Sequence, residues 1–148
     1  MPRPQNVLVS ALAVGLWLGF REIGLTGADH NWHTELELGA DNVLYVEQAH
    51  SYDAHIRRLP FLKPEGRSKE LAGEPVTRAD MFSIREIFLA WSVLHSSYEK
   101  IDRIARRHVA SIRNCSASTF IDAFDRMDLS QFLSGKPPTI GDNRDSSR

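Results

Sequence analysis

The 148-residue sequence predicts a mainly α protein, in which an apolar N-terminal membrane helix precedes a small helical hairpin or bundle with one long heptad-patterned helix. Three observations predict this class. Residues 7–20 carry no charge, residues 42–59 repeat apolar side chains at helical spacing, and residues 78–114 contain a seven-residue repeat. The predicted parts are an anchor or signal segment (1–28), a helical domain (29–135) and a polar tail (136–148).

Composition restricts the possible partners. The formal net charge of -1 gives the chain no overall attraction to nucleic acid or to anionic lipid, so any electrostatic partner must bind locally. The only cysteine, Cys115, cannot form an internal disulfide. The sequence therefore excludes a disulfide-stabilised fold and a generally basic nucleic-acid-binding domain.

The apolar N-terminus predicts a single-pass membrane helix. A helix over 7–20 would be hydrophobic all round, and it would reach the roughly 30 Å bilayer core if it continued to residue 25. Arg3 precedes this segment and acidic residues follow it, which predicts a cytoplasmic N-terminus and an exported helical domain. The alternatives are a signal peptide cleaved after residues 26–28, giving a secreted or periplasmic protein, and a buried helix of a cytoplasmic protein. The predicted membrane residues are Val7, Leu8, Leu12, Leu16, Trp17, Leu18 and Phe20.

A helix is predicted over residues 42–59. Tyr45, Ala49, Tyr52, Ile56 and Leu59 are separated by four or three residues, and a proline follows directly. The alternative is a β-hairpin in which TELEL and VLYVE flank the turn GADN. Three prolines and two glycines then predict a surface loop over 60–77.

The strongest periodic segment predicts a long helix over 78–114. Thr77 and Asp80 have capping-box spacing at its start. Apolar residues seven apart then form a seam that predicts packing within a bundle, a protein partner or a homo-oligomer. The predicted interface residues are Ile84, Ile87, Trp91, Leu94, Tyr98 and Ile101. A last helix over 118–134 is predicted from the capping pair Thr119 and Asp122.

These features predict a non-catalytic, membrane-associated helical interaction or assembly protein that uses no cofactor. Basic residues on the face opposite the seam offer an alternative partner, either a nucleic acid or an anionic lipid surface. Glu99 and Asp102 have the i,i+4 spacing that would pair with two of these residues and dilute their field. The basic residues are Lys100, Arg103, Arg106, Arg107 and Arg113.

The alternative function is that of a small helical hydrolase. The Arg-x4-His spacing of Arg103 and His108 resembles that of HEPN-type ribonucleases, which are helical and work as dimers, and this resemblance implies a catalytic pair. Glu47 and His50 have the Glu-x-x-His spacing of one half of a di-iron site, which would make them metal ligands. The tail GDNRDSSR, residues 141–148, resembles a box of type I signal peptidases, but no serine nucleophile with a lysine base accompanies it.

Overall fold

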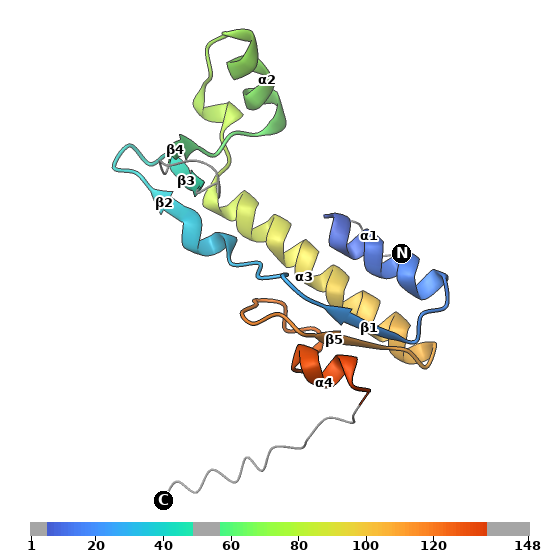
Figure 1. The fold of residues 1–148 in the computed structure, drawn as a ribbon. Coiled ribbons are helices and arrows are strands. Elements are labelled where there is room, and N and C mark those ends of the chain that lie inside the picture. The colour runs from blue at the N-terminus through green and yellow to red at the C-terminus, as the bar shows by residue number, and fades with distance from the viewer. Residues whose placement is uncertain (1–5, 49–56, 136–148) are drawn as a thin grey trace, which may run out of the picture. The chain divides into compact units, whose positions relative to one another are not determined.

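The computed structural model describes residues 6–48 and 57–135. The chain divides into two compact units, each with its own three-stranded sheet (Figure 1). The parallel-sheet unit comprises residues 1–29 and 97–148, and the antiparallel-sheet unit comprises residues 30–96. Helix α3 (Ile84–Arg107) contributes its N-terminal half to the second unit and its C-terminal half to the first. The prediction of a mainly α bundle is therefore wrong, because the fold is mixed α/β.

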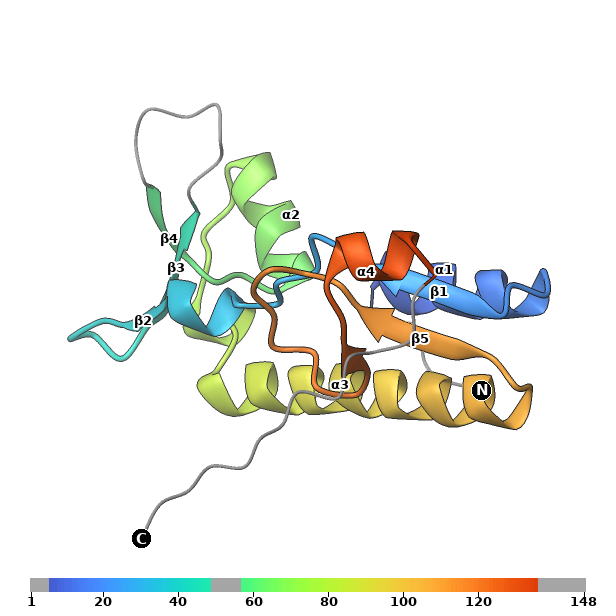
Figure 2. The ribbon, with the colours of Figure 1, turned by 60° about the horizontal axis from the view of Figure 1, so that its bottom comes forward.

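The parallel-sheet unit is built on three short strands in the order β1-β5-β6. These are β1 (Glu22–Leu25), β5 (Ser111–Asn114) and β6 (Asp125–Arg126). β1 pairs with β5 from Glu22 opposite Ser111 to Leu25 opposite Asn114, so the two strands end level. In Figures 1 and 2, β1 and β5 lie between the C-terminal half of α3 and helix α4 (Leu129–Leu133).

Helices cover both faces of the parallel sheet. Helix α1 (Val7–Trp17) approaches β1 so closely that a Cβ at Gly15 would lie 3.2 Å from the Cδ1 of Ile23. On the other face, a Cβ at Gly24 would lie 2.8 Å from the ring of Phe132 in α4. Glycine is thus required at position 24 for close packing of helix on strand.

Helix α1 is too short for the predicted membrane anchor. It has 11 residues, about 16 Å of helix, against a bilayer core of about 30 Å. Gly19, with φ +90, ends it by donating its N–H to the carbonyl of Leu16. Among the described residues, no helix combines the length and apolarity needed to cross a bilayer. The prediction of a single-pass membrane helix at the N-terminus is therefore wrong.

The apolar side chains of α1 have a different role from the predicted one. Val9 and Leu12 are buried, because this side of the helix packs inside the unit. The remaining predicted membrane residues divide by exposure: Leu8 and Leu16 are half-buried, while Val7, Trp17, Leu18 and Phe20 are exposed. The buried side explains only part of the apolar character of this segment.

The antiparallel-sheet unit contains β2 (Leu36–Leu38), β3 (Leu44–Gln48) and β4 (Arg57–Pro60). β2 and β3 form a hairpin in which Leu38 pairs with Leu44, around a turn where Asn42 adopts φ +61. The Asp41 carboxylate accepts the N–H of Val43 and fixes this turn. The predicted helix over 42–59 is therefore wrong and the hairpin around GADN is confirmed; residues 49–56 lie outside the described residues.

The segment predicted as a loop over 60–77 also contains a helix. α2 (Pro64–Ala72) begins with a proline in its first turn, where the missing N–H is not needed. It ends at Gly73, which adopts φ +71. The proline and the glycine therefore mark the start and the stop of a helix rather than a continuous connection.

The two remaining predicted helices are shorter than expected. The Thr77–Asp80 capping box is confirmed, but it encloses only the 3-10 turn η2 (Arg78–Asp80). α3 begins at Ile84, where Ser83 and Glu86 exchange hydrogen bonds, and ends at Arg107 before strand β5, so the helix predicted over 78–114 is wrong at both ends.

The helix predicted over 118–134 is reduced to α4. The side chain of Thr119 bonds to neighbouring loops instead of capping a helix. Asp128 is the residue that caps α4, by accepting from the N–H groups of Ser130 and Gln131. Another 3-10 turn, η1 (Trp32–Glu35), precedes β2.

The antiparallel-sheet unit should lose stability in acid. Hydrogen bonds from Lys69 and Thr77 hold the pKa of Asp80 well below its usual range, and hydrogen bonds from Ser83 and Lys63 lower the pKa of Glu86 to about 2. A carboxyl group whose pKa is lowered by folding stabilises the fold at pH values above its ordinary pKa, which is 4.5 for Glu86. This contribution is lost as the pH falls towards about 2. Urea-unfolding midpoints measured from neutral pH to pH 2 should fall through this window.

A matched pair of variants tests this assignment. Glu86→Gln should lower the urea midpoint at neutral pH and should flatten its fall in acid, because the titrating group is gone. Glu65→Gln, an exposed position on α2, should follow the wild-type curve. If Glu86→Gln and wild type lost stability in parallel, Glu86 would not be a source of the acid sensitivity.

Candidate functional site

The three strands of the parallel sheet end at one edge. The register aligns Leu25, Asn114 and Arg126, so the loops that follow them leave the sheet together. Ligands of open parallel α/β sheets bind in the crevice outside the carboxyl ends of the strands. This edge is therefore the expected position of a ligand site in this sheet.

A buried asparagine organises this edge. Asn114 is fully buried at 0% exposure. Its Nδ2 donates to the Oγ1 of Thr119 and to the carbonyl of Ile121, both at 3.1 Å, and its Oδ1 accepts the N–H of Ser116 at 3.1 Å. A buried amide with its polar atoms paired holds the loop in one conformation, since each lost partner would leave an unpaired polar group.

Further hydrogen bonds connect the loops after β1 and β5. The N–H of Ala28 donates to the Oγ of Ser116 at 3.1 Å, and the Oγ1 of Thr119 donates to the carbonyl of Ala28 at 2.7 Å. From the end of β6, the guanidinium of Arg126 donates to the carbonyls of Ser116 and Ala117, at 2.8 and 3.1 Å. The loops after β1 and β5 and the end of β6 are thus linked to one another, which pre-organises the edge for binding.

A cavity of about 650 Å³ opens at this edge. Its volume lies in the range of small-molecule sites. Residues from all three loops and from α4 line it, so the linked loops form its wall. The polar lining residues are Thr26, Ser116, Arg126, Asp128 and Gln131, and the others include Cys115, Ala117, Met127 and Leu129.

The two reactive groups in this wall are poorly suited to catalysis. Hydrogen bonds from Ser130 and Gln131 lower the pKa of Asp128, so this carboxylate is ionised and weakly basic. Burial raises the pKa of the Cys115 thiol, which is therefore protonated and weakly nucleophilic at neutral pH. The wall can donate and accept hydrogen bonds, but these two groups are not activated for proton transfer or for attack.

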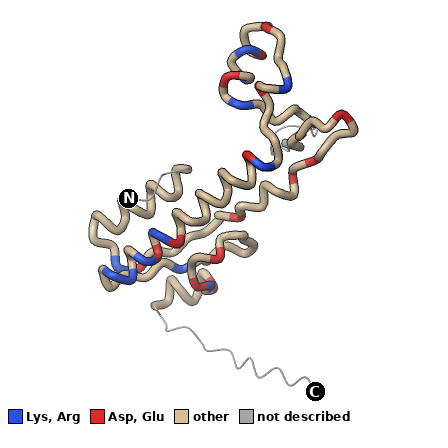
Figure 3. The backbone as a smooth tube through the Cα atoms, turned by 180° about the vertical axis from the view of Figure 1, so that it is seen from behind, with Lys and Arg blue, Asp and Glu red and all other residues tan. Residues whose placement is uncertain are grey.

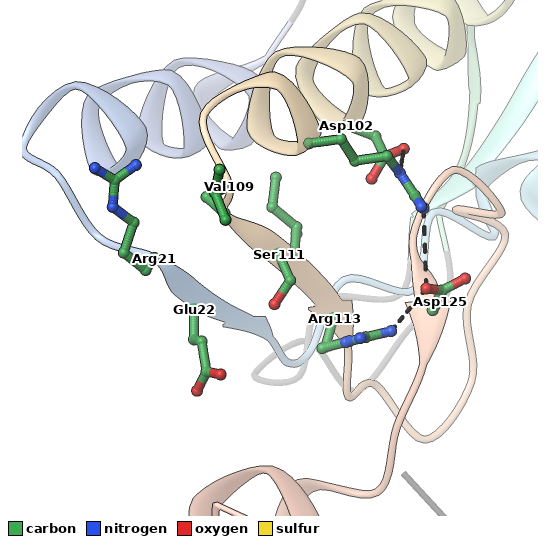
Figure 4. Close-up of a pocket in the computed structure, with 10 residues that line it drawn as sticks. Arg21, Glu22, Asp102, Val109, Ser111, Arg113 and Asp125 are labelled. Carbon is green, nitrogen blue, oxygen red and sulfur yellow. Dashed lines mark hydrogen bonds and ion pairs between the residues drawn. The ribbon is translucent and has the colours of Figure 1, made fainter. Parts of the chain in front are cut away.

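A second cavity, of about 500 Å³, lies where β1 and β5 begin (Figure 4). Ion pairs occupy four of its charged groups: Arg106 pairs with Asp102 at 2.6 Å, and Arg113 pairs with Asp125 at 2.7 Å. Arg21 and Glu22 also line the cavity and add one charge of each sign. The second nitrogen of Arg106 also lies 3.9 Å from the Asp125 carboxylate. These charges compensate one another, so the cavity is an ion-pair network at the end of the sheet opposite the strand-end edge.

The same ion pairs reduce the net positive charge of the predicted basic face of α3. Figure 3 shows acidic residues among the Lys and Arg residues at the C-terminal end of this helix. Asp102 pairs with Arg106, which the i,i+4 spacing of these two residues predicted. Asp125 pairs with Arg113. An uninterrupted basic surface for a nucleic acid or an anionic membrane does not form here. Such a partner stays a prediction for the exposed residues Lys100, Arg103 and Arg107.

The structure does not bring Arg103 and His108 together as a catalytic pair. The Nε of Arg103, an exposed residue, donates to the carbonyl of Glu99 one turn earlier, at 3.4 Å. The side chain of His108 is also exposed, and its carbonyl accepts a hydrogen bond from the guanidinium of Arg21. Within one chain, the pair implied by the resemblance to HEPN-type ribonucleases is therefore not assembled.

Only one of the two predicted metal ligands lies among the described residues. Glu47 belongs to β3, a strand rather than the predicted helix, while His50 and the tail 141–148 lie outside the described residues. In residues 6–48 and 57–135, no three His, Cys, Asp or Glu residues are grouped so that they could hold a metal ion.

Most of the predicted interface residues of α3 are buried in the chain itself. Ile87, Leu94, Tyr98 and Ile101 are each at most 4% exposed, and Trp91 is half-buried. Ile84 is 42% exposed and Phe88, one turn further, is 55% exposed. A partner protein or a second copy on this helix stays a prediction, which now concerns its N-terminal end.

Sequence reasoning missed the strand-end edge because its strands have only two to four residues. The useful signal was a short alternating run followed by small polar residues, which occurs twice, in EIGLTGAD and in SIRNCSAST. The residues of β5 were instead predicted as the end of the helix over 78–114, and Thr119 as the cap of the helix over 118–134. Comparison of the chain with protein-family models, with curated proteins and with solved structures gave no significant match.

Proposed function

We propose that this chain is a non-catalytic binding protein whose site is the cavity at the carboxyl edge of the β1-β5-β6 sheet. One observation carries the proposal: a cavity of about 650 Å³ opens where three parallel strands end. Parallel α/β sheets bind their ligands at this position for a geometric reason, because the loops that diverge there create a crevice. The linked loops support the proposal, since a pre-organised wall loses less entropy on binding.

The wall favours a small polar ligand without a large net charge. Arg126 and Asp128 contribute one charge of each sign, and Thr26 and Gln131 contribute a hydroxyl and an amide. Met127 adds an apolar surface beside them. A neutral or zwitterionic molecule with both hydrogen-bond donors and acceptors matches this set better than a polyanion does, because the Asp128 carboxylate would repel a polyanion.

Backbone amide NMR with three probes tests the site. Glucose, serine and adenosine, each titrated to millimolar concentration, represent neutral polyol, zwitterionic and nucleoside ligands. At least one should shift the amide signals of residues 26–28, 115–119 and 127–131 together. Ala117→Trp, which fills the cavity from an exposed loop position, should weaken binding at least about tenfold. Ala72→Trp, at an exposed position of α2, should bind like wild type.

Two outcomes would contradict the proposal. Shifts confined to other residues would place the binding elsewhere. Equal affinity in Ala117→Trp and Ala72→Trp would show that the strand-end cavity is not the site. Comparison of the amide spectra of the two variants before titration separates loss of binding from loss of folding.

A further inference from the structure

A third cavity, an apolar groove of about 730 Å³, runs between α1 and the C-terminal half of α3. Val9 and Ile101, each 1% exposed, are among its most buried lining residues. Ala13, Leu16 and Ile104 line its walls. From Val9 to Trp17 the helix rises about 12 Å, which sets the length of the groove wall on this side.

The rim of this groove is unusually apolar. Val14 is 52% exposed and Trp17 is 83% exposed, although both lie on the solvent side of α1. A surface helix normally carries polar or charged residues on this side, whereas α1 carries no charge. A contiguous exposed apolar surface in a folded unit indicates that something binds there.

One end of the groove is cationic. Arg21 lines it together with His108, whose carbonyl accepts a hydrogen bond from the Arg21 guanidinium. This contact orients the guanidinium and uses one of its five N–H donors, so others remain for an anion. No carboxylate is among the described residues that line this groove. A ligand with an apolar chain and an anionic head group is therefore complementary to the groove in both polarity and charge.

We propose that the groove between α1 and α3 binds a single-chain anionic amphiphile, with its chain along Val9, Ala13 and Ile104 and its head group at Arg21. A fatty acid carboxylate is the simplest member of this class. The groove has no lining residue in common with the cavity at the strand ends, so this site is independent of the function proposed above. The other candidate occupants, a second copy of this chain and the surface of a bilayer, are separated from it by the experiment.

Calorimetric titration of the wild-type chain with monomeric amphiphiles tests the ligand class without any mutation. Octanoate, decanoate and dodecanoate are used below their critical micelle concentrations. Binding should saturate at one ligand per chain, and each added methylene should lower Kd by about two- to fourfold until the chain fills the groove. Dodecyltrimethylammonium, with the same chain and a cationic head group, should bind at least about threefold more weakly than dodecanoate.

Variants then locate the ligand. Ala13→Trp should abolish dodecanoate binding by filling the groove, and Ile104→Trp fills it from α3 if the first variant fails to fold. Arg21→Gln should weaken dodecanoate about three- to tenfold but leave the affinity for dodecyltrimethylammonium unchanged or improved. Arg85→Gln, at an exposed position in the antiparallel-sheet unit, is the matched control and should bind both ligands like wild type.

Each alternative has a distinct signature that would overturn the proposal. Absence of heat with all three carboxylates at two temperatures, or unchanged binding in a folded Ala13→Trp or Ile104→Trp variant, would exclude the groove as the site. Equal affinity for the anionic and the cationic amphiphile would show that Arg21 does not bind the head group. A dimer in sedimentation analysis that the filling variants dissociate would assign the groove to a second copy. Sedimentation with phosphatidylglycerol vesicles but no binding of monomeric dodecanoate would assign it to a bilayer surface.

Discussion

Replacing Tyr98 by alanine should lower the free energy of unfolding of the parallel-sheet unit by about 3 to 5 kcal/mol. Tyr98 is fully buried, and its ring lies edge-on to that of Phe124 at a centroid distance of 5.8 Å. Its hydroxyl accepts a hydrogen bond from the Nδ2 of Asn6 at 3.0 Å. The truncation therefore removes an aromatic contact that joins α3 to the segment before β6, and it leaves a cavity. Urea unfolding monitored by circular dichroism measures the loss.

Two further variants separate the contributions to this effect. Tyr98→Phe removes only the hydroxyl and should cost about 1 kcal/mol. Phe88→Ala, on the same helix but 55% exposed, should change stability by about 0.5 kcal/mol or less. A Tyr98→Ala variant no less stable than Phe88→Ala would mean that Tyr98 is not a core residue.

The middle of α3 is the part of the fold that the sequence predicted best. Leu94, Tyr98 and Ile101 recur at spacings of four and three, and all three are buried. Periodicity over many turns is a strong signal because one continuous apolar face leaves few other conformations. The ends of the helix were less predictable, since Ile112 continues the seven-residue spacing and yet belongs to β5. An apolar residue at this spacing fits a short buried strand as well as it fits the next turn of a helix.

The parallel sheet could not be predicted from local patterns. β1 and β5 have four residues each and pair across most of the chain, from Glu22 to Ser111 at one end. Strands of this length show too few alternations to distinguish them from loops, and no turn joins the two in sequence. The cavity at the strand ends was missed for the same reason, because its walls come together only once the sheet forms.

The apolar N-terminus was misinterpreted for a physical reason. A helix that is apolar on every side is typical of a membrane span, and Val7, Val14 and Trp17 contributed to that pattern. In the structure these three side chains are exposed on an 11-residue helix whose other side is buried. The same pattern therefore arises when one side of a short helix packs on a sheet and the opposite side is exposed.

Asn114→Leu should lower the free energy of unfolding by about 3 kcal/mol, although leucine fills a similar volume. The N–H of Ser116 and the carbonyl of Ile121 would lose their bonds to the Asn114 amide. Unpaired buried polar groups cost about 1 to 3 kcal/mol each.

The same change should also weaken the strand-end site, because Asn114 holds the loop that carries Ser116 and Ala117 into the cavity wall. Urea unfolding measures the first effect, and the amide titration with the probe that binds wild type measures the second. Asn31→Leu, at an exposed position, is the matched control and should be close to wild type in both. If Asn114→Leu matched Asn31→Leu in stability, the amide network would not hold the edge together. If it lost stability but bound the probe with wild-type affinity, the network would support the fold without positioning the site.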